Sequence, residues 1–326
     1  MMYIDMHCDT LLKGVREEKE DIYEMPDAMV DVRRLKEAKV MCQFFAIFFP
    51  PKQSNYPESA KPFLEDEELF TRAREIFLNT IARYPKALGQ ATNYREVIGH
   101  QEADRVAGIL TMEDGRAVLG SMERLQYFYK QGVRLISLTW NYENCFGAPN
   151  SEDPKIMEKG LTAFGKEAIG VMNELGILID VSHLSDGGFY DVASLSKKPF
   201  VASHSNCRSL CGHKRNLTDE MIHILAEHGG VAGVNFEPTF LQYDRKDQHS
   251  TMERIAAHLK HLIRIGGEEC AGIGTDFDGI GGIFEVGEPS AMERLFTYLH
   301  RNGFSEDLLE KIAYRNVLRV IKESMK

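Results

Sequence analysis

The sequence predicts a TIM-like (β/α)8 barrel that occupies residues 1–326 as a single domain. Two observations carry this prediction. Eight short apolar runs alternate with segments of helical periodicity, which is typical of βαβ units around a parallel sheet. Most of these runs also end in a residue that can bind a metal or move a proton, and a barrel gathers such strand ends on one face.

The predicted strands are mostly continuous apolar runs. Alternation of apolar and polar residues would indicate a strand with one wet face, whereas continuous runs indicate parallel strands covered on both sides. We place the strands at residues 3–7, 40–48, 107–112, 133–139, 176–182, 199–203, 230–235 and 271–275.

Helical spacing of apolar residues fills the intervals between these runs. The last helix begins at Ser305-Glu306-Asp307-Leu308, which resembles a capping box with acid in the first turn. The predicted helices are Asp27–Ala38, Glu65–Arg83, Ala117–Gln131, Thr162–Leu175, Thr218–His228, Thr251–Ile265, Ala291–Arg301 and Ser305–Lys326.

The connections that leave the strands are often long, while several that enter them are short. In a barrel the long connections all project from one face, where they act as lids or binding loops. The long connections are residues 50–62, 141–160, 236–250 and 277–290.

Composition excludes several classes of protein. The net charge of −10 with no basic stripe argues against a nucleic-acid partner. No apolar run approaches the roughly 20 residues that span a bilayer, and the N-terminus has no signal-peptide pattern. Six cysteines lie scattered without CxxC spacing, as reduced thiols would. We therefore expect a cytoplasmic protein with no membrane partner.

Five residues at strand ends are candidate metal ligands. His7 and Asp9 are two apart on a strand, so both side chains point to one face. His183 and His204 each follow a serine at the end of an apolar run. Glu113 could cap the next helix, but its two oxygens could also bind two different metal ions. With Glu113 shared, each of two metals has three protein ligands, as in catalytic zinc sites.

Two further residues suit catalysis and substrate binding. Asp276 is not needed as a ligand, so it could exchange protons with a metal-activated water, with Asp278 as the alternative. The planar guanidinium of Arg215 suits a substrate carboxylate, although a surface basic cluster explains its position equally well. The other histidines are expected to be structural or solvent-facing, namely His213, His223, His228, His258, His261 and His300.

At this point the motifs resemble those of the membrane dipeptidase family of zinc metallopeptidases. The resemblance runs from residue 3 to about Arg319 and preserves the order of the motifs. The motifs are Asp5-Met6-His7-Cys8-Asp9, Asp180-Val181-Ser182-His183, Ser203-His204-Ser205, Arg215-Asn216 and Gly274-Thr275-Asp276-Phe277-Asp278-Gly279.

The resemblance implies a barrel enzyme that hydrolyses dipeptides with hydroxide activated by two bridged zinc ions. By this resemblance His7 and Asp9 hold the first zinc with Glu113, and His183 and His204 complete the second. The same ligand types would also accept manganese or cobalt.

The resemblance also assigns the remaining site residues. Asp276 matches the family's proton-shuttling acid, and Arg215 matches the arginine that receives the substrate's C-terminal carboxylate. Trp140 and Asn141 fall in the substrate site, where some members carry a substrate-contacting histidine. Phe240 aligns where some members have a tyrosine. Both departures bear on substrate preference more than on the reaction.

We expect a dipeptidase of this kind, with a D-residue at the C-terminal position among its substrates. Two alternatives stay open from the sequence. One is another amide, lactam or lactone hydrolase on the same two metals, and the other is a barrel that binds metal or ligand without turnover. The oligomeric state is open as well, a homodimer included.

Overall fold

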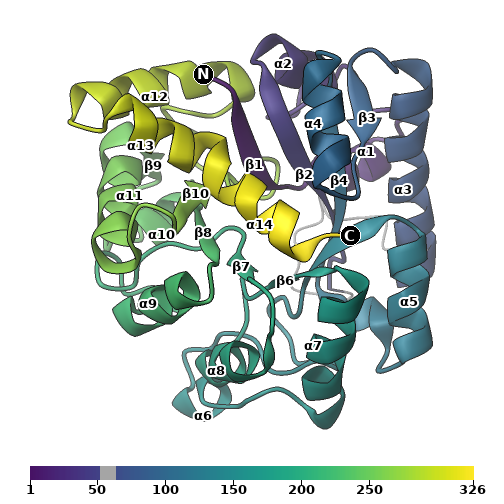
Figure 1. The fold of residues 1–326 in the computed structure, drawn as a ribbon, viewed down its shortest axis with the longest axis vertical. Helices are drawn as coiled ribbons and strands as arrows, with labels where there is room; N and C mark the ends of the chain where they lie inside the picture. The colour runs from purple at the N-terminus through teal and green to yellow at the C-terminus, as the bar shows by residue number, and fades with distance from the viewer. Residues whose placement is uncertain (52–63) are drawn as a thin grey trace.

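Eight parallel strands close into a barrel in the computed structural model, which describes residues 1–51 and 64–326 (Figure 1). Around the barrel the order is β1-β2-β4-β5-β6-β7-β8-β10, and β10 returns to β1. The strands are β1 (Tyr3–Cys8), β2 (Val40–Phe48), β4 (Val106–Glu113), β5 (Val133–Ser137), β6 (Leu178–Asp180), β7 (Val201–Ala202), β8 (Val231–Val234) and β10 (Ala271–Ile273).

These eight strands confirm the predicted barrel, and three further short strands were missed. β3 (Leu88–Gln90) pairs with the beginning of β4, below the point where β5 joins it. β9 (His249–Ser250) and β11 (Ile283–Phe284) form a separate parallel pair within the loops. Unlike β6, β7 and β10, which are equally short, these three strands do not lie within a longer apolar run of the sequence, so no pattern marks them.

Helices cover the outside of the barrel (Figure 1). Polar residues that precede most of them accept hydrogen bonds from the first turn, as Ser305 does from the backbone N–H of Leu308. The helices are α1 (Thr10–Arg16), α2 (Val32–Glu37), α3 (Asp66–Arg83), α4 (Tyr94–Glu102), α5 (Met122–Lys130), α6 (Pro154–Met157), α7 (Ala163–Leu175), α8 (Asp186–Leu195), α9 (Asp219–Glu227), α10 (Pro238–Leu241), α11 (Met252–Gly266), α12 (Met292–Arg301), α13 (Glu306–Glu310) and α14 (Asn316–Ser324).

Several helix predictions were wrong. Helices α1, α4 and α8 were not predicted, and α2 begins at Val32 because the Asp31 side chain caps it there. Helix α5 begins at Met122 instead of residue 117. Leu119 and Gly120 adopt left-handed backbone angles, with φ of 55° and 68°, and these angles end the preceding turn. The predicted helix 305–326 is interrupted by a π-helical turn between α13 and α14.

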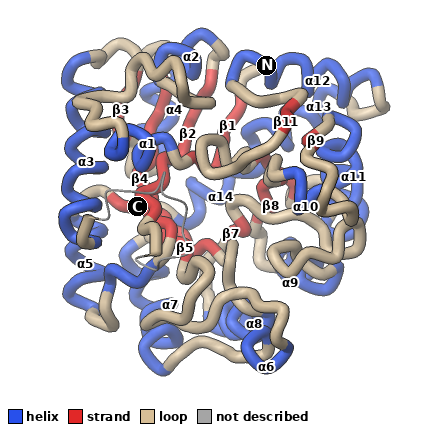
Figure 2. Tube along the Cα trace, turned by 180° about the vertical axis from the view of Figure 1, so that it is seen from behind, coloured by secondary structure: helices blue, strands red, loops and turns tan. Residues whose placement is uncertain are grey.

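The two ends of the barrel differ in what covers them. Helix α14 crosses the N-terminal end of the strands (Figure 1), and its Val317, Val320 and Ile321 pack with apolar side chains of the barrel interior. The view from behind shows loops over the other end (Figure 2). Apolar contacts with α14 therefore close the barrel at the N-terminal ends of its strands, and loops surround the C-terminal ends.

Three of the predicted long loops, 141–160, 236–250 and 277–290, follow β5, β8 and β10, so all three lie at the C-terminal ends of the strands. Short helices or strands interrupt each of them, such as α6 in 141–160 and α10 in 236–250. The fourth predicted loop, 50–62, lies from residue 52 onward outside the described residues. Within the described part of the chain, every helix is too short or too polar to cross a bilayer.

Two glycines let one strand end approach the barrel interior. A Cβ on Gly274 would lie 1.8 Å from the backbone oxygen of Ser203, and one on Gly233 would lie 2.2 Å from the same atom. Gly233 lies in β8, which pairs with β7, and Gly274 follows β10, the strand on the other side of β8. The absence of two side chains thus gives room for the backbone that carries His204.

We predict opposite effects of alanine at two glycines. Gly274→Ala should lower the free energy of unfolding by about 2 kcal/mol or more, because the new methyl group meets backbone atoms. Gly170→Ala, on the exposed face of α7 with open space around it, should raise it by about 0.5–1 kcal/mol. Urea denaturation of both variants checks this, and equal stabilities would contradict the close approach.

Candidate active site

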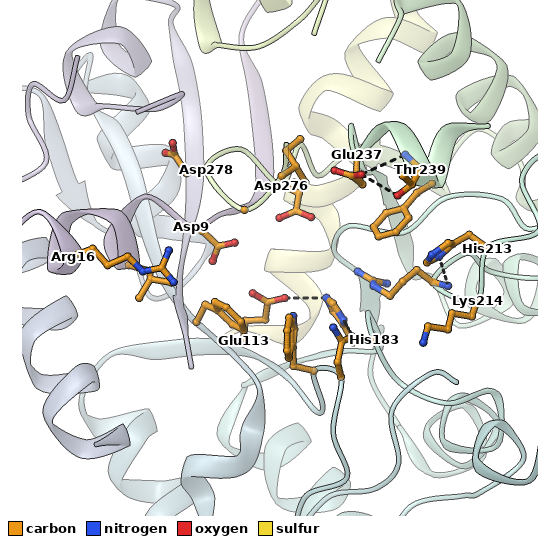
Figure 3. Close-up of a pocket in the computed structure, with 18 residues that line it drawn as sticks. Asp9, Arg16, Glu113, His183, His213, Lys214, Glu237, Thr239, Asp276 and Asp278 are labelled. Carbon is orange, nitrogen blue, oxygen red and sulfur yellow. Dashed lines mark hydrogen bonds and ion pairs between the residues drawn. The ribbon is translucent and has the colours of Figure 1, made fainter. Parts of the chain in front are cut away.

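The five predicted metal ligands meet at the C-terminal end of the barrel. Their side chains are all buried and come from the ends of four strands. Figure 3 shows the carboxylates of Asp9, Glu113 and Asp276 turned toward one space, with the ring of His183 next to Glu113. His7 and Asp276 lie about 270 positions apart in the sequence, and the barrel brings them together.

One half of the cluster surrounds Glu113. Its Oε1 lies 2.9 Å from His183 Nε2 and 3.6 Å from His204 Nε2. The two Nε2 atoms lie 3.1 Å from each other. The lone pairs of one oxygen and two nitrogen atoms therefore face one another, and a cation bound by all three atoms would remove their mutual repulsion.

The other half surrounds His7. Its Nε2 lies 3.5 Å from Glu113 Oε2, 3.7 Å from Asp9 Oδ2 and 3.8 Å from Asp276 Oδ1. The sets His7, Asp9, Asp276 and His7, Glu113, His204 each bring three ligand atoms within 4.8 Å of one another. Glu113 contributes one oxygen to each half of the cluster, as a bridging ligand would.

Unsatisfied polar atoms show that this cluster fits a divalent metal. Both ring nitrogens of His7 and Oδ1 of Asp9 are buried and lack hydrogen-bond partners among the described residues. Asp9 stands at the N-terminus of α1, yet its carboxylate does not cap that helix. Buried polar atoms without partners are costly, and imidazole nitrogens with carboxylate oxygens are the ligands that zinc prefers.

Local backbone irregularities aim three of these side chains inward. Ile4 and Met6 point into the barrel interior, so strict alternation would turn His7 away, but a register shift between Asp5 and Cys8 brings it inward. His183 and Asp276 adopt left-handed angles, with φ of 67° and 63°. Non-glycine residues in this region store strain, which is common at functional sites.

Hydrogen bonds from outside the cluster orient its imidazoles. Ser203 Oγ donates to Asp180 Oδ2 at 2.6 Å and accepts from His204 Nδ1 at 2.7 Å. With its proton on Nδ1, His204 presents the lone pair of Nε2 to the cluster. The amide oxygen of Asn141 accepts a hydrogen bond from His183 Nδ1 at 3.2 Å. This bond likewise turns the lone pair of His183 Nε2 toward the cluster.

Sequence reasoning gave no role to Asp180, although one of the sequence motifs contains it, and missed Asn235. Asp180 accepts hydrogen bonds from Ser137, Ser182 and Ser203, so it ties together the ends of β5, β6 and β7. Asn235 donates through Nδ2 to Asp276 Oδ2 at 2.8 Å. Asn235 is the last residue of the predicted strand 230–235, so the strand-end pattern that found the ligands could have found it too.

Burial and neighbouring charges shift the pKa values of the cluster. Burial alone would lower the pKa of His7, but the carboxylates of Glu113 and Asp9 raise it well above its usual range. Burial raises the pKa of Glu113 to about 7 and that of Asp276 to about 8. It lowers the pKa of His183 and His204 well below the usual range, which keeps both rings neutral and able to bind a cation.

The carboxylate of Asp278, the alternative to Asp276, is occupied elsewhere. It accepts from Thr10 Oγ1 at 2.6 Å and from the backbone N–H of Met29 at 2.7 Å. These bonds fasten α1 and the segment before α2 to the loop after β10. Asp276 instead keeps Oδ1 near His7, so its position suits proton transfer in the cluster better.

The guanidinium of Arg215 is buried, with 5% of the residue exposed. Nη1 donates to Ser205 Oγ at 3.1 Å and Nη2 to the backbone oxygen of His204 at 3.2 Å. Nε has no partner among the described residues, and Phe240 lies 5.5 Å below the guanidinium. Burial lowers the pKa of Arg215 to about 10, so the group remains charged at neutral pH.

A cleft of about 410 Å³ opens over the cluster (Figure 3). Trp140 lines it between Phe48 and His183, with ring centroids 4.9 and 6.0 Å away. Asn141, Arg215 and Phe240 line it as well. His213, expected to be structural or solvent-facing, also contributes to the wall, with its ring 4.6 Å from that of Phe240.

Comparison with protein families gives one match over the full chain. A family model described as Membrane dipeptidase (Peptidase family M19) matches residues 1–326. An uncharacterized protein in the pqqA 5' region of Klebsiella pneumoniae is 40% identical over 210 residues, which cover 62% of this chain and 76% of the relative. Dipeptidase verJ of Clonostachys rogersoniana is 30% identical over 301 residues, covering 90% of this chain and 75% of the relative.

Two solved structures are similar along the whole barrel. The dipeptidase AC, a metallopeptidase, has a TM-score of 0.88 and 29% identity, with 100% of this chain and 99% of the other covered. A metallopeptidase from Rhodobacter sphaeroides, liganded with a phosphinate mimic of the dipeptide L-Ala-D-Ala, has a TM-score of 0.88 and 28% identity. In that pair 99% of each chain is covered.

We predict that Asn141→Ala weakens zinc binding about tenfold or more, because His183 loses the partner that orients its ring. Competition with a chromogenic chelator measures the affinity. Asn302→Ala, at the exposed end of α12, serves as the control and should bind zinc as the wild type does. If Asn141→Ala binds zinc as tightly as the wild type, Asn141 does not orient His183.

Proposed function

The chain belongs to the membrane dipeptidase family of metallopeptidases, and from this premise we propose that it hydrolyses dipeptides with two zinc ions held by His7, Asp9, Glu113, His183 and His204. The observation that carries the proposal is the buried cluster in which Glu113 directs one oxygen to each half. When bound, the two metals would polarise the scissile carbonyl and lower the pKa of water, so that water attacks at neutral pH.

Asp276 is the proposed proton acceptor and donor. Asn235 holds its Oδ2, while Oδ1 faces the cluster near His7. One oxygen therefore fixes the carboxylate, and the other can take a proton from the attacking water. The same oxygen then gives the proton to the leaving amine, which would otherwise depart as a poor leaving group.

Arg215 is the proposed anchor of the substrate's C-terminal carboxylate. Ser205, the backbone of His204 and the ring of Phe240 hold the guanidinium in place. A carboxylate that docks there puts the neighbouring peptide bond over the cluster. This anchor selects the peptide bond next to the free C-terminal carboxylate, which in a dipeptide is its one peptide bond.

Trp140 and Phe240 shape the cleft around this substrate. Where some family members present a histidine and a tyrosine, these two side chains give aromatic walls with less capacity for hydrogen bonding. We propose that a C-terminal D-residue is among the accepted ones. The neighbour from Rhodobacter sphaeroides supports this, since its structure contains a mimic of L-Ala-D-Ala.

The proposal is tested by metal analysis together with a dipeptide assay. Purified protein should contain about two zinc ions per chain and release amino acids from L-Ala-L-Ala or L-Ala-D-Ala. Dialysis against a chelator should abolish the activity, and added zinc should restore it. A zinc-loaded protein that cleaves no dipeptide in a panel varied at both positions would refute the proposed activity.

The role of Asp276 has its own test, with Asp278 as the matched comparison. Asp276→Asn should lower kcat about 10²-fold or more while zinc content is retained, because an amide cannot take the proton. Asp278→Asn should lose stability, since Thr10 and Met29 are anchored there, but its kcat per folded molecule should stay near that of the wild type. The reverse pattern would make Asp278 the acid–base group.

A further inference from the structure

Arg16 brings a second guanidinium to the cleft, which the proposed chemistry does not use. It is the last residue of α1 and lines the cleft together with Asp9, Leu12 and Phe48. Figure 3 shows its side chain beyond Asp9, on the side of the cleft away from His213 and Lys214. The cleft therefore has cationic side chains at both of its ends.

The guanidinium of Arg16 has unused hydrogen-bond donors. Its Nε and Nη2 are buried and have no partner among the described residues. Asp9 is its neighbour in the cleft wall, but the ion pairs of the described residues do not include one between them. Donors that are shielded from water and left unpaired are costly, and an acceptor brought by a ligand would relieve that cost.

Helix α1 holds the backbone of Arg16 firmly. Leu11, Leu12 and Val15 are buried against the core. A Cβ on Gly14 would lie 3.2 Å from Ile22, so the helix packs closely on its neighbours. Beyond the helix, the backbone N–H of Lys19 donates to the oxygen of Gly14 at 2.9 Å. The backbone of Arg16 is therefore fixed at the edge of the cleft.

Given the proposed dipeptidase activity, on which this inference rests, the polarity of the substrate follows from Arg215. Its neighbours His213 and Lys214 mark one end of the cleft in Figure 3, with Glu113 and His183 in the middle. A dipeptide whose C-terminal carboxylate is held by Arg215 and whose peptide bond lies over the cluster must extend its N-terminal residue toward the other end. That end is where Arg16 lies.

We propose that Arg16 binds the side-chain carboxylate of an acidic N-terminal residue, so that the preferred substrates are dipeptides beginning with Asp or Glu. The planar guanidinium offers two parallel N–H donors that match a carboxylate. The competing carboxylates on this side are engaged, Asp9 in the metal-ligand cluster and Asp278 with Thr10 and Met29. Among the described residues at this end of the cleft, Arg16 thus has hydrogen-bond donors available to a substrate side chain.

The test compares two dipeptides that differ in one charge. The wild type should cleave L-Glu-L-Ala with a kcat/KM about tenfold or more above that of L-Gln-L-Ala, which has nearly the same shape. The difference should lie in KM, because Arg16 contacts a part of the substrate that does not react. Arg16→Met should bring the ratio of the two kcat/KM values to about one, while L-Gln-L-Ala is cleaved as before.

Lys13→Met is the matched control. Lys13 is on the same helix, but it donates to the backbone oxygen of Asp27 and does not line the cleft. This variant should keep the wild-type ratio. Equal cleavage of both dipeptides by the wild type, or a ratio that persists in Arg16→Met, would overturn the role of Arg16 and leave the dipeptidase activity standing. A zinc-loaded wild type that cleaves neither of these dipeptides nor any other in the panel would instead reject the dipeptidase activity itself.

Discussion

Three carboxylates, those of Asp9, Glu113 and Asp276, approach the single imidazole of His7 within 3.5–3.8 Å in a buried part of the barrel. Two like charges about 4 Å apart repel by several kcal/mol even at the effective dielectric of a protein surface. The raised pKa values of Glu113 and Asp276 are the consequence of this burial. Protons or cations have to neutralise the cluster, and Ser203, Asn141 and Asn235 fix the orientation of its members through hydrogen bonds.

The barrel gathers the strand ends, but the side chains reach the cluster through local departures from regular geometry. The register shift at the end of β1 turns His7 inward, and left-handed angles do the same for His183 and Asp276. The glycines at 233 and 274 let the backbone of Ser203 approach, which carries His204 toward the centre. Each departure destabilises the fold locally, so the regular strands and their apolar contacts have to supply the stability that keeps them in place.

The sequence was informative where a property depends on residue type and strand order. Apolar runs with polar ends were enough to predict the barrel and to bring the five candidate ligands to one face. The strand-end pattern alone did not separate Asp276 from Asp278, because both follow the same strand and differ in hydrogen-bond partners, and only the family resemblance favoured Asp276. Helix α8 was missed since two glycines stand in its first turn, where the cap at Ser185 and packing of Phe189 and Val192 override their low propensity.

In the proposed function, recognition of the substrate depends on the charged side chains at the two ends of the cleft. Trp140 and Phe240 replace side chains that could form more hydrogen bonds in some family members, so the middle of the cleft offers shape and apolar surface. Arg215 is held by the same segment that carries His204, whereas Arg16 belongs to the helix that follows Asp9. A substrate that binds both arginines would therefore contact two separate segments of the chain. One of them carries His204 and the other carries Asp9. Because the neighbours of each guanidinium are distinct, changes at one end of a substrate should affect binding independently of changes at the other.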